Sequence, residues 1–260
     1  MILSSPSSVA FQFMGFSIYW YGIIIAFAIL VGAFVADFFY RKYFKVELDI
    51  MDIIPTLLLV GVCGARIYYC ILNWEYYAAR PLDILNVREG GLSIHGMFIF
   101  CAIFLLIYCK IKKVSFFNLA APMCLGISLA QSIGRWGNFF NSEAYGKPFD
   151  GFLKLYISPD MRPLGLENFH YFHPTFLYES VLDFCIFLLL ILTIVKLKKS
   201  PLFITSFYFA LYSCVRIFVE SFRIDSVVYI CGLPIATVVS VVILFFAAFG
   251  IVLDLKYKFR

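Results

Sequence analysis

The stretch GRWGNFFNSEAYG, residues 134–146, follows a nearly uncharged run and offers side chains that can do chemistry. Arg135 presents a planar fork of donors that suits a phosphate group. Asn138 and Asn141 can bridge phosphate and hydroxyl groups, and Glu143 can transfer protons. We therefore expect a phosphate-binding and acid/base site in this part of the chain.

A second group of polar side chains lies at helical spacing inside apolar runs. Four of them follow one another at offsets of 4, 4 and 3 residues and so share one helical face: Tyr212, Arg216, Glu220 and Arg223. Glu179 lies in another apolar run, four residues before Asp183. We expect these faces to converge with Arg135 on one polar cavity.

Three arginines, Arg66, Arg135 and Arg216, fall in or at the edge of these apolar runs. An arginine at mid-membrane costs about 2.5–3.5 kcal/mol on insertion scales, so each is a candidate for function. The alternative is an arginine at a helix end whose side chain reaches the lipid headgroups. Polar neighbours at helical spacing favour function for Arg135 and Arg216. For Arg66 both interpretations stay open.

The sequence contains three histidines. His95 lies in GGLSIHG, residues 90–96, where the glycines, Gly96 among them, indicate a loop that enters a span. It is either a base or orienting donor, or a structural histidine. His170 and His173 are spaced HxxH without an HExxH motif, so no zinc site is predicted. Serine-nucleophile and nucleotide-binding motifs such as GxSxG are absent from the sequence as well.

The elements that position these residues must lie in a membrane. Of the 260 residues, 63% are hydrophobic and 14% are charged, and the mean hydropathy is +0.92. A soluble domain usually has about 25% charged residues. The net charge of +5 comes from short basic clusters between apolar runs, so it does not indicate a nucleic-acid partner. The eight cysteines lie mostly inside apolar runs without a CxxC pair, so no disulfide framework is expected.

Apolar runs of about 20 residues predict transmembrane helices. Seven such runs occur, at residues 18–40, 54–73, 94–111, 117–139, 174–195, 201–220 and 229–253. We therefore predict an all-α polytopic membrane protein with seven transmembrane helices, forming a single integral membrane domain over residues 1–260. Within it, the segment 140–173 is the predicted small outer head loop.

The connections between these runs alternate in charge. Basic residues gather at 41–45, 110–113, 196–199 and 256–260. Cytoplasmic loops carry an excess of Lys and Arg, so the C-terminus is predicted to be cytoplasmic and the N-terminus to lie outside. The connections 74–93 and 140–173 are then external, and the polar site faces the outer leaflet.

These motifs resemble those of bacterial prolipoprotein diacylglyceryl transferases. The stretch at 134–146 is similar to the family signature of the form GRxGNFxNxExxG. Further segments resemble family motifs in the expected order: WYG (20–22), GARIYY (64–69), GGLSIHG (90–96), HPTFLYE (173–179) and RIFVESFR (216–223). Together they are spread over most of the chain, from residue 20 to residue 223.

The resemblance implies a reaction and a location. Such an enzyme takes the diacylglyceryl group of phosphatidylglycerol and attaches it to the lipobox cysteine thiol of a preprolipoprotein signal peptide. A thioether forms, glycerol phosphate leaves, and lipoprotein maturation begins. The implied location is the bacterial cytoplasmic (inner) membrane, with the active site toward the outer leaflet. Neither a metal nor an organic cofactor is implied.

The resemblance also assigns roles to residues of this sequence. Arg135 and Arg216 are expected to grip the lipid phosphate, and Asn138 and Asn141 to orient the headgroup. His95 is the candidate base by analogy, with Tyr21 or a carboxylate as alternatives. The remaining expected members are Glu143 and Glu220, which position the arginines or shuttle protons, and the substrate contacts Tyr212, Glu179, Arg66 and Gly96.

Two other functions are compatible with the polar placement alone. A secondary transporter for an anionic solute could be built around Arg135 and Arg216, but inverted repeats would support it and none is detected in the sequence. A structural membrane protein does not need the polar signatures. One assay separates the enzyme from the transporter. Release of glycerol phosphate in the presence of a cysteine peptide supports the enzyme, whereas solute flux in liposomes without such release supports the transporter.

Overall fold

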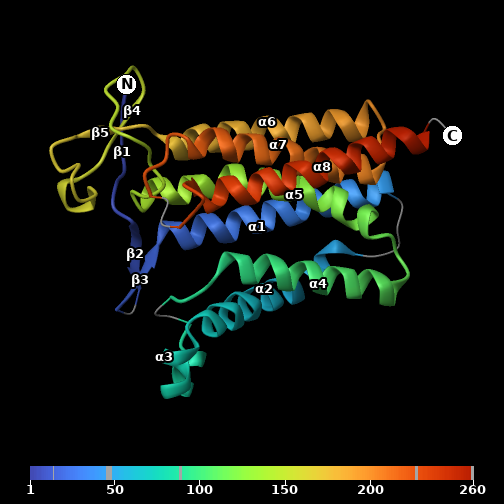
Figure 1. Cartoon of the computed structure of the whole chain (residues 1–260), viewed down its shortest axis with the longest axis horizontal. Coiled ribbons are helices and arrows are strands. Elements are labelled where there is room, and N and C mark those ends of the chain that lie inside the picture. The colour runs from blue at the N-terminus through green and yellow to red at the C-terminus, as the bar shows by residue number, and fades with distance from the viewer. Residues whose placement is uncertain (14, 45–48, 88–89, 226–227, 259–260) are drawn as a thin grey trace. The chain divides into compact units, whose positions relative to one another are not determined.

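The computed structural model describes residues 1–13, 15–44, 49–87, 90–225 and 228–258. Within this part of the chain, seven helices are long and apolar enough to cross a membrane, which confirms the predicted all-α polytopic architecture (Figure 1). They are α1 (Trp20–Phe39, followed by a π-helical turn, Tyr40–Phe44), α2 (Ile50–Leu72), α4 (Ile94–Lys112), α5 (Phe116–Phe140), α6 (Thr175–Val195), α7 (Pro201–Glu220) and α8 (Ile235–Lys258).

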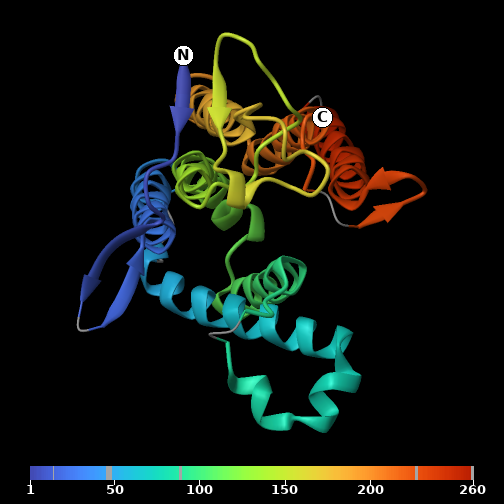
Figure 2. The ribbon, with the colours of Figure 1, turned by 90° about the vertical axis from the view of Figure 1, so that its left-hand side faces the viewer.

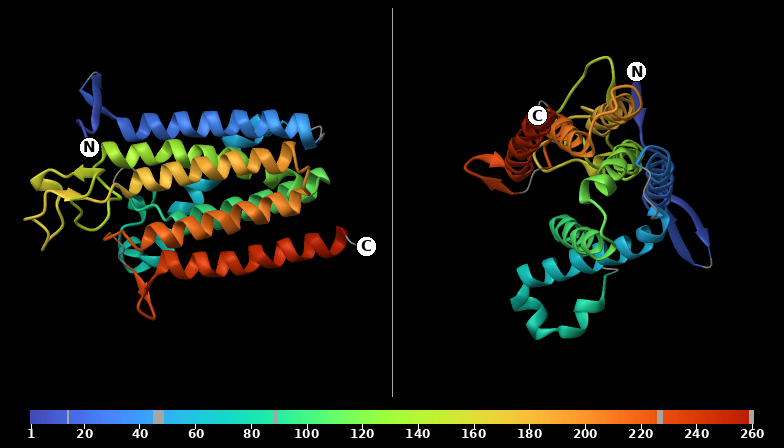
Figure 3. Two further views of the ribbon diagram at one scale, coloured as in Figure 1. Left: turned by 90° about the horizontal axis from the view of Figure 1, so that it is seen from above. Right: turned by 90° about the vertical axis from the view of Figure 1, so that its right-hand side faces the viewer.

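The chain divides into two compact units, residues 1–39 with 120–260, and residues 40–119. The first unit contains α1, α5, α6, α7 and α8, and α7 packs against both α6 and α8 (Figures 2 and 3). Helices α1 and α5 approach closely at Gly32 and Gly126, where a Cβ on either glycine would collide with the other's carbonyl oxygen. Small residues permit such backbone contact between membrane helices.

A small head region lies at one end of these helices (Figure 1). Strand β4 (Lys154–Tyr156) is central, with β1 (Ile2–Ser4) parallel on one side and β5 (Tyr171–Phe172) antiparallel on the other. A 3₁₀ turn, η3 (Pro159–Met161), follows β4. The strands cover a buried core of Tyr145, Leu155, Ile157, Phe172 and Phe176. The N-terminal strand thus pairs with a strand of the segment predicted as the head loop, residues 140–173. The side of the membrane on which both lie stays a prediction.

Two short hairpins complete the first unit. Strands β2 (Val9–Phe13) and β3 (Phe16–Tyr19) precede α1, and β6 (Tyr229–Ile230) and β7 (Leu233–Pro234) precede α8. The last span was predicted to begin at residue 229, and this is wrong because α8 begins at Ile235. Cys231 and Gly232 both have positive φ, of 50° and 78°, which is the backbone conformation of a tight two-residue hairpin turn.

The second unit is a helical hairpin. Helices α2 and α4 pack against each other, and α3 (Trp74–Ala79) and a 3₁₀ turn, η2 (Pro81–Leu85), lie in the connection between them. Asp49 caps α2 by accepting a hydrogen bond of 2.9 Å from the Met51 amide. A Cβ on Gly64 would collide with the Phe100 ring, and one on Gly96 with the Gly64 carbonyl, so α2 and α4 touch through their backbones at this level.

His173 makes the head region sensitive to acid. Its ring stacks on Phe149 with centroids 3.9 Å apart, and its Nδ1 lies 3.1 Å from the Tyr178 hydroxyl. Burial and the charge of Lys147 lower the pKa of His173 below its usual 6.5. The folded state therefore disfavours the protonated ring. The free energy of unfolding should fall as the pH drops below the pKa that the histidine has in the unfolded chain.

Thermal unfolding of the purified protein at about pH 7.5 and about pH 5.5 tests this expectation. We expect a lower midpoint at the acidic pH in the wild type and a smaller acid-induced drop in His173→Asn. Equal pH dependence in both proteins would show that His173 does not contribute.

Candidate functional site

Glu179 is the centre of the site. It lies in the first turns of α6, its side chain is 1% exposed, and it forms an ion pair with Arg135 of α5. Arg216 of α7 places Nη1 3.8 Å from the same Glu179 oxygen, Oε1. Arg223, just beyond α7, places Nη1 3.7 Å from Oε2. Three guanidinium groups from separate segments therefore meet at one buried carboxylate, and we call these four residues the arginine cluster.

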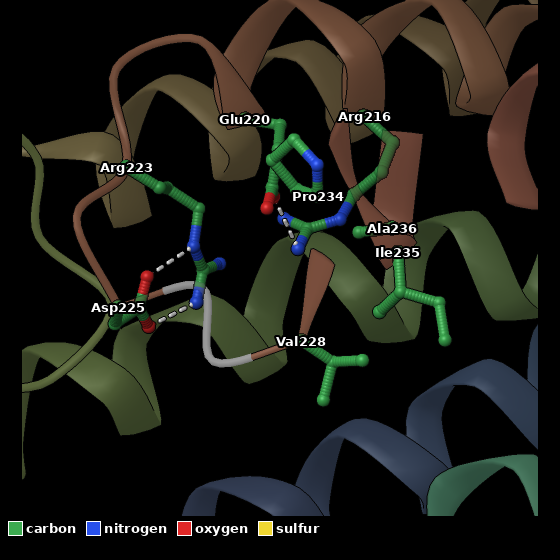
Figure 4. Close-up of a pocket in the computed structure, with 8 residues that line it drawn as sticks. All are labelled: Arg216, Glu220, Arg223, Asp225, Val228, Pro234, Ile235 and Ala236. Atoms are coloured by element: carbon green, nitrogen blue, oxygen red, sulfur yellow. Dashed lines mark hydrogen bonds and ion pairs between the residues drawn. The ribbon is translucent and has the colours of Figure 1, made fainter. Parts of the chain in front are cut away.

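Two of the arginines have a second acidic partner. Nη2 of Arg216 lies 2.6 Å from Oε2 of Glu220, one turn further along α7. Arg223 donates from Nε and Nη2 to the two carboxylate oxygens of Asp225, at 2.8 and 2.5 Å (Figure 4). Burial opposes the charged form of both groups, but their paired hydrogen bonds and mutual attraction outweigh it. The pKa of Asp225 is therefore lowered and that of Arg223 is raised.

A pocket opens beside Arg216 and Arg223. Its volume is about 140 Å³, and charged side chains meet apolar ones in its lining: Arg216, Glu220, Arg223, Asp225, Val228, Pro234, Ile235 and Ala236 (Figure 4). The apolar side comes from the hairpin before α8 and from the start of that helix. A pocket of this kind, which we call the arginine pocket, suits a group that is anionic at one end and apolar at the other.

The end of α5 forms a second polar group. Asn138 donates to Oε1 of Glu143 at 2.8 Å, and Asn141 approaches the same oxygen at 3.4 Å. The amide of Glu143 donates to the carbonyl of Asn138 at 3.0 Å, which closes the turn after the helix. Glu143 and Asp225 both line a second pocket of about 240 Å³. The three predicted residues Asn138, Asn141 and Glu143 therefore lie together, and the Glu143 carboxylate holds both asparagine side chains.

The two tyrosines expected at the site lie on two helices of the first unit, Tyr21 on α1 and Tyr212 on α7. The Tyr21 ring of α1 packs on Gly137 of α5, where a Cβ would lie 2.9 Å from Tyr21 Cδ2. Gly137 is thus needed for this close approach. Tyr212 lies one turn before Arg216 in α7 and stacks on Tyr208, with ring centroids 6.1 Å apart. Tyr208 in turn donates to Oε1 of Gln131 at 2.9 Å.

Asp183 lies one turn beyond Glu179 in α6 and is fully buried. Neither of its carboxylate oxygens has a hydrogen-bond partner among the residues that the structure describes. It therefore differs from Glu179, whose Oε1 atom accepts a hydrogen bond from Arg135.

Arg66 belongs to the second unit and binds backbone. Its five N–H donors make five hydrogen bonds of 2.5–2.9 Å to the carbonyl oxygens of Asp83, Ile84, Asn86, Gly90 and Gly91. An arginine has five such donors, so none remains for a phosphate. This geometry supports neither contact with the lipid phosphate nor a side chain that reaches the headgroups. It instead supports a bracing role, because the guanidinium organises the connection between α2 and α4.

Arg66→Lys should loosen this connection. The ammonium group of lysine cannot contact all five carbonyl groups that surround the planar guanidinium. Each hydrogen bond to a charged group that is lost is worth about 1.5–3 kcal/mol. We expect faster proteolytic cleavage between residues 80 and 93 and a lower unfolding midpoint, with Arg80→Lys as the exposed control. Cleavage at the wild-type rate would contradict the bracing role.

His95 and Gly96 also belong to the second unit. His95 is the second residue of α4, and the turn before it is fixed by a 3.0 Å hydrogen bond from the Ser93 amide to the Ala65 carbonyl. Gly96 faces Gly64 in the contact between α2 and α4. The two units are described separately, so the role of His95 as a base stays a prediction, as does substrate contact by Gly96.

Sequence reasoning missed one residue of the site, Asp225, and part of the role of two others. Arg223 was expected on the helical face that converges on the polar cavity, but no role was predicted for it, although it lines the arginine pocket. Asp225 was not singled out at all, and the signal that could have found it is an acid two residues after an arginine. Glu179 was expected only as a substrate contact, whereas it joins all three arginines.

Comparisons with known proteins point to one family. A family profile described as Prolipoprotein diacylglyceryl transferase matches residues 8–253. A phosphatidylglycerol–prolipoprotein diacylglyceryl transferase of Synechococcus sp. (strain CC9902) is 41% identical over 230 residues, covering 86% of this chain and 82% of the relative. The protein of that name from Finegoldia magna is 40% identical over 250 residues, covering 96% and 95% of the two chains.

Proposed function

Because the chain belongs to the prolipoprotein diacylglyceryl transferase family, we propose that the arginine cluster forms the centre of its active site. The chain is a multi-pass membrane transferase that moves a diacylglyceryl group from phosphatidylglycerol to a prolipoprotein. This transfer is the first step of lipoprotein maturation. The observation that supports the site is the meeting of Arg135, Arg216 and Arg223 at the Glu179 carboxylate.

The acceptor is the thiol of the lipobox cysteine in the signal peptide. Its sulfur attacks the glycerol carbon that carries the phosphate, so a thioether forms while the carbon–oxygen bond to phosphate breaks. Glycerol phosphate leaves with the electron pair of that bond, and the thiol proton passes to a base. A free thiol has a pKa of about 8.5, so most of it is protonated at neutral pH and needs such a base.

The guanidinium groups stabilise the charge that grows on the departing phosphate. Arg135 and Arg216 are held on two helices by a carboxylate that is itself an anion, so their donors already point at one place. Donors fixed in advance in a water-poor site stabilise developing charge without reorganising during the reaction. When the lipid binds, its phosphate accepts some of the hydrogen bonds that the arginines otherwise donate to carboxylates, with Arg223 as an additional donor.

Asn138 and Asn141 orient the distal glycerol of the headgroup. Both already bind Glu143, whose carboxylate can accept hydrogen bonds from glycerol hydroxyls. Tyr212, next to Arg216 on α7, is a further contact for the lipid. Glu220 keeps Arg216 in place through their ion pair.

The proton acceptor is one of a small set. His95 is the first candidate by analogy, with Tyr21 or one of the carboxylates, Glu143 or Glu220, as alternatives. His95→Asn should reduce kcat at least about 100-fold if the imidazole is the base, because proton transfer by a positioned side chain contributes about 10²–10⁴-fold. Steady-state rates across pH test this, and retention of most activity would demote His95 to an orienting group.

The location follows from the same proposal. Phosphatidylglycerol and the signal peptide both reside in the bacterial cytoplasmic membrane, and the positive-inside rule puts the head region outside. The active site then faces the outer leaflet, where an exported cysteine emerges. The lipid tails and the signal-peptide helix both enter from the bilayer.

A reconstituted assay tests the function. Purified protein is incubated with phosphatidylglycerol and a lipobox peptide, and glycerol phosphate is measured together with the mass of the peptide. We expect release and peptide modification with the cysteine peptide, and neither with an otherwise identical serine peptide. No release from the cysteine peptide, or equal release from the two peptides, would contradict the proposal.

A further inference from the structure

The fork of Arg223 is already occupied by an anion that the chain itself supplies. Two parallel hydrogen bonds, of 2.8 and 2.5 Å, join its Nε and Nη2 atoms to the two oxygens of Asp225. A phosphate group binds an arginine through the same pair of donors. Asp225 therefore takes the place on Arg223 that a phosphate would need.

The charges around the arginine pocket are balanced. Arg135, Arg216 and Arg223 carry three positive charges, and the carboxylates paired with them carry three negative charges when ionised: Glu179, Glu220 and Asp225. Since such a cluster has no net positive charge to attract an anion, a phosphate binds well only if one carboxylate withdraws from its arginine.

Exposure identifies which carboxylate can withdraw. The side chains of Glu179 and Glu220 are only 1% and 4% exposed, whereas that of Asp225 is 43% exposed. A buried carboxylate that loses its partner is left as an uncompensated charge, but an exposed one is solvated by water. Asp225 also lies after the end of α7, so it is not fixed by a helix.

Asp225 has open space on two sides. It lines both the arginine pocket, with Arg216 and Arg223, and the second pocket, with Glu143 and Tyr145. Because Asp225 borders both cavities, its carboxylate has room to turn from one toward the other.

We propose that Asp225 is a built-in competitor for the phosphate of the substrate. It pairs with the Arg223 fork until lipid binds, gives way to the lipid phosphate, and returns after the transfer to help expel glycerol phosphate. Only ion pairs are exchanged, and Asp225 makes no covalent bond and moves no proton. The inference rests on the proposed function for the identity of the anion, and it makes Asp225 a positioning residue that acts through Arg223.

Direct binding of glycerol phosphate to the purified full-length protein tests the competition without relying on turnover. Asp225→Asn should bind glycerol phosphate about tenfold more tightly by calorimetry, because the competing charge is gone. In the transfer assay the same variant should show a lower KM for phosphatidylglycerol together with a lower kcat, because product leaves more slowly. A purely structural role would instead raise KM or leave it unchanged.

Asp150→Asn is the matched control. Asp150 is an exposed head-region acid that forms an ion pair with Lys154, so its loss changes the net charge equally without touching Arg223. We expect wild-type affinity there, and equal tightening in both variants would reduce the effect to net charge and overturn the proposal. If Asp225→Asn does not fold, Asp225→Ser carries the same expectation.

The outcomes separate this inference from the proposed function. Unchanged or weaker glycerol phosphate binding in the Asp225 variant, with normal transfer by the wild type, overturns the competition alone. Tighter binding in that variant, with no transfer by the wild type, supports an anion-binding site at which Asp225 competes. It contradicts the proposal that the arginine cluster catalyses the transfer.

Discussion

Replacing Glu179 by glutamine is expected to reduce kcat/KM by at least about 100-fold. The side chain is buried and its carboxylate is shared by Arg135, Arg216 and Arg223. Glutamine keeps the shape but removes the charge, and breaking a buried ion pair in this way costs about 3–5 kcal/mol. The arginines then repel one another and lose their common orientation. Steady-state transfer to a lipobox peptide measures the effect.

Asp183→Asn is the matched control for this experiment. It makes the same carboxylate-to-amide change one turn further along α6, at a residue that is equally buried but has no hydrogen-bond partner among the described residues. We expect it to lose much less transfer than the Glu179 variant, since Asp183 makes no hydrogen bond among the described residues, whereas Glu179 forms ion pairs with the arginines. Near-normal activity of the Glu179 variant would show that the cluster does not need its central carboxylate.

Arg135→Lys is expected to lower kcat about 100-fold while the protein still folds. Lysine keeps the positive charge, but its ammonium is a point charge that cannot contact a carboxylate and a phosphate through one planar fork. Loss of a preorganised donor to developing charge typically costs about 10²–10³ in kcat. The measurement is the rate of glycerol phosphate release at saturating lipid.

The same change at Arg80 provides the comparison. Arg80 is exposed, and its guanidinium contacts Tyr76, through the hydroxyl at 3.4 Å and over the ring. It lies far along the chain from every residue of the arginine cluster, so Arg80→Lys should transfer at the wild-type rate. If Arg135→Lys matched it, Arg135 would have no role in binding phosphate.

The sequence predicts the membrane architecture well because hydropathy is a local property. Spans of about 20 apolar residues are visible without knowledge of their neighbours. The start of α8 is an exception, since Tyr229–Pro234 are as apolar as a span but form a hairpin. The turn depends on positive φ at Cys231 and Gly232, and cysteine at such a position gives no turn signal in the sequence.

The candidate site could be predicted only in part. Helical spacing placed Arg216 with Glu220, and the structure pairs them at 2.6 Å. Spacing led us to expect that these faces converge, but it could not show that the three arginines meet at Glu179, because that depends on how α5, α6 and α7 pack. Arg66 shows the opposite limit: its apolar surroundings were compatible with lipid binding, but its partners are backbone carbonyls that any sequence would supply.

A structure of the protein with a phosphatidylglycerol analogue bound tests the central claim most directly. The claim is that guanidinium groups from α5 and α7 hold one lipid phosphate. We predict phosphate oxygens within about 2.7–2.9 Å of guanidinium nitrogens of both Arg135 and Arg216. A phosphate that contacts neither arginine, or only one of them while the other stays on Glu179, would contradict the account.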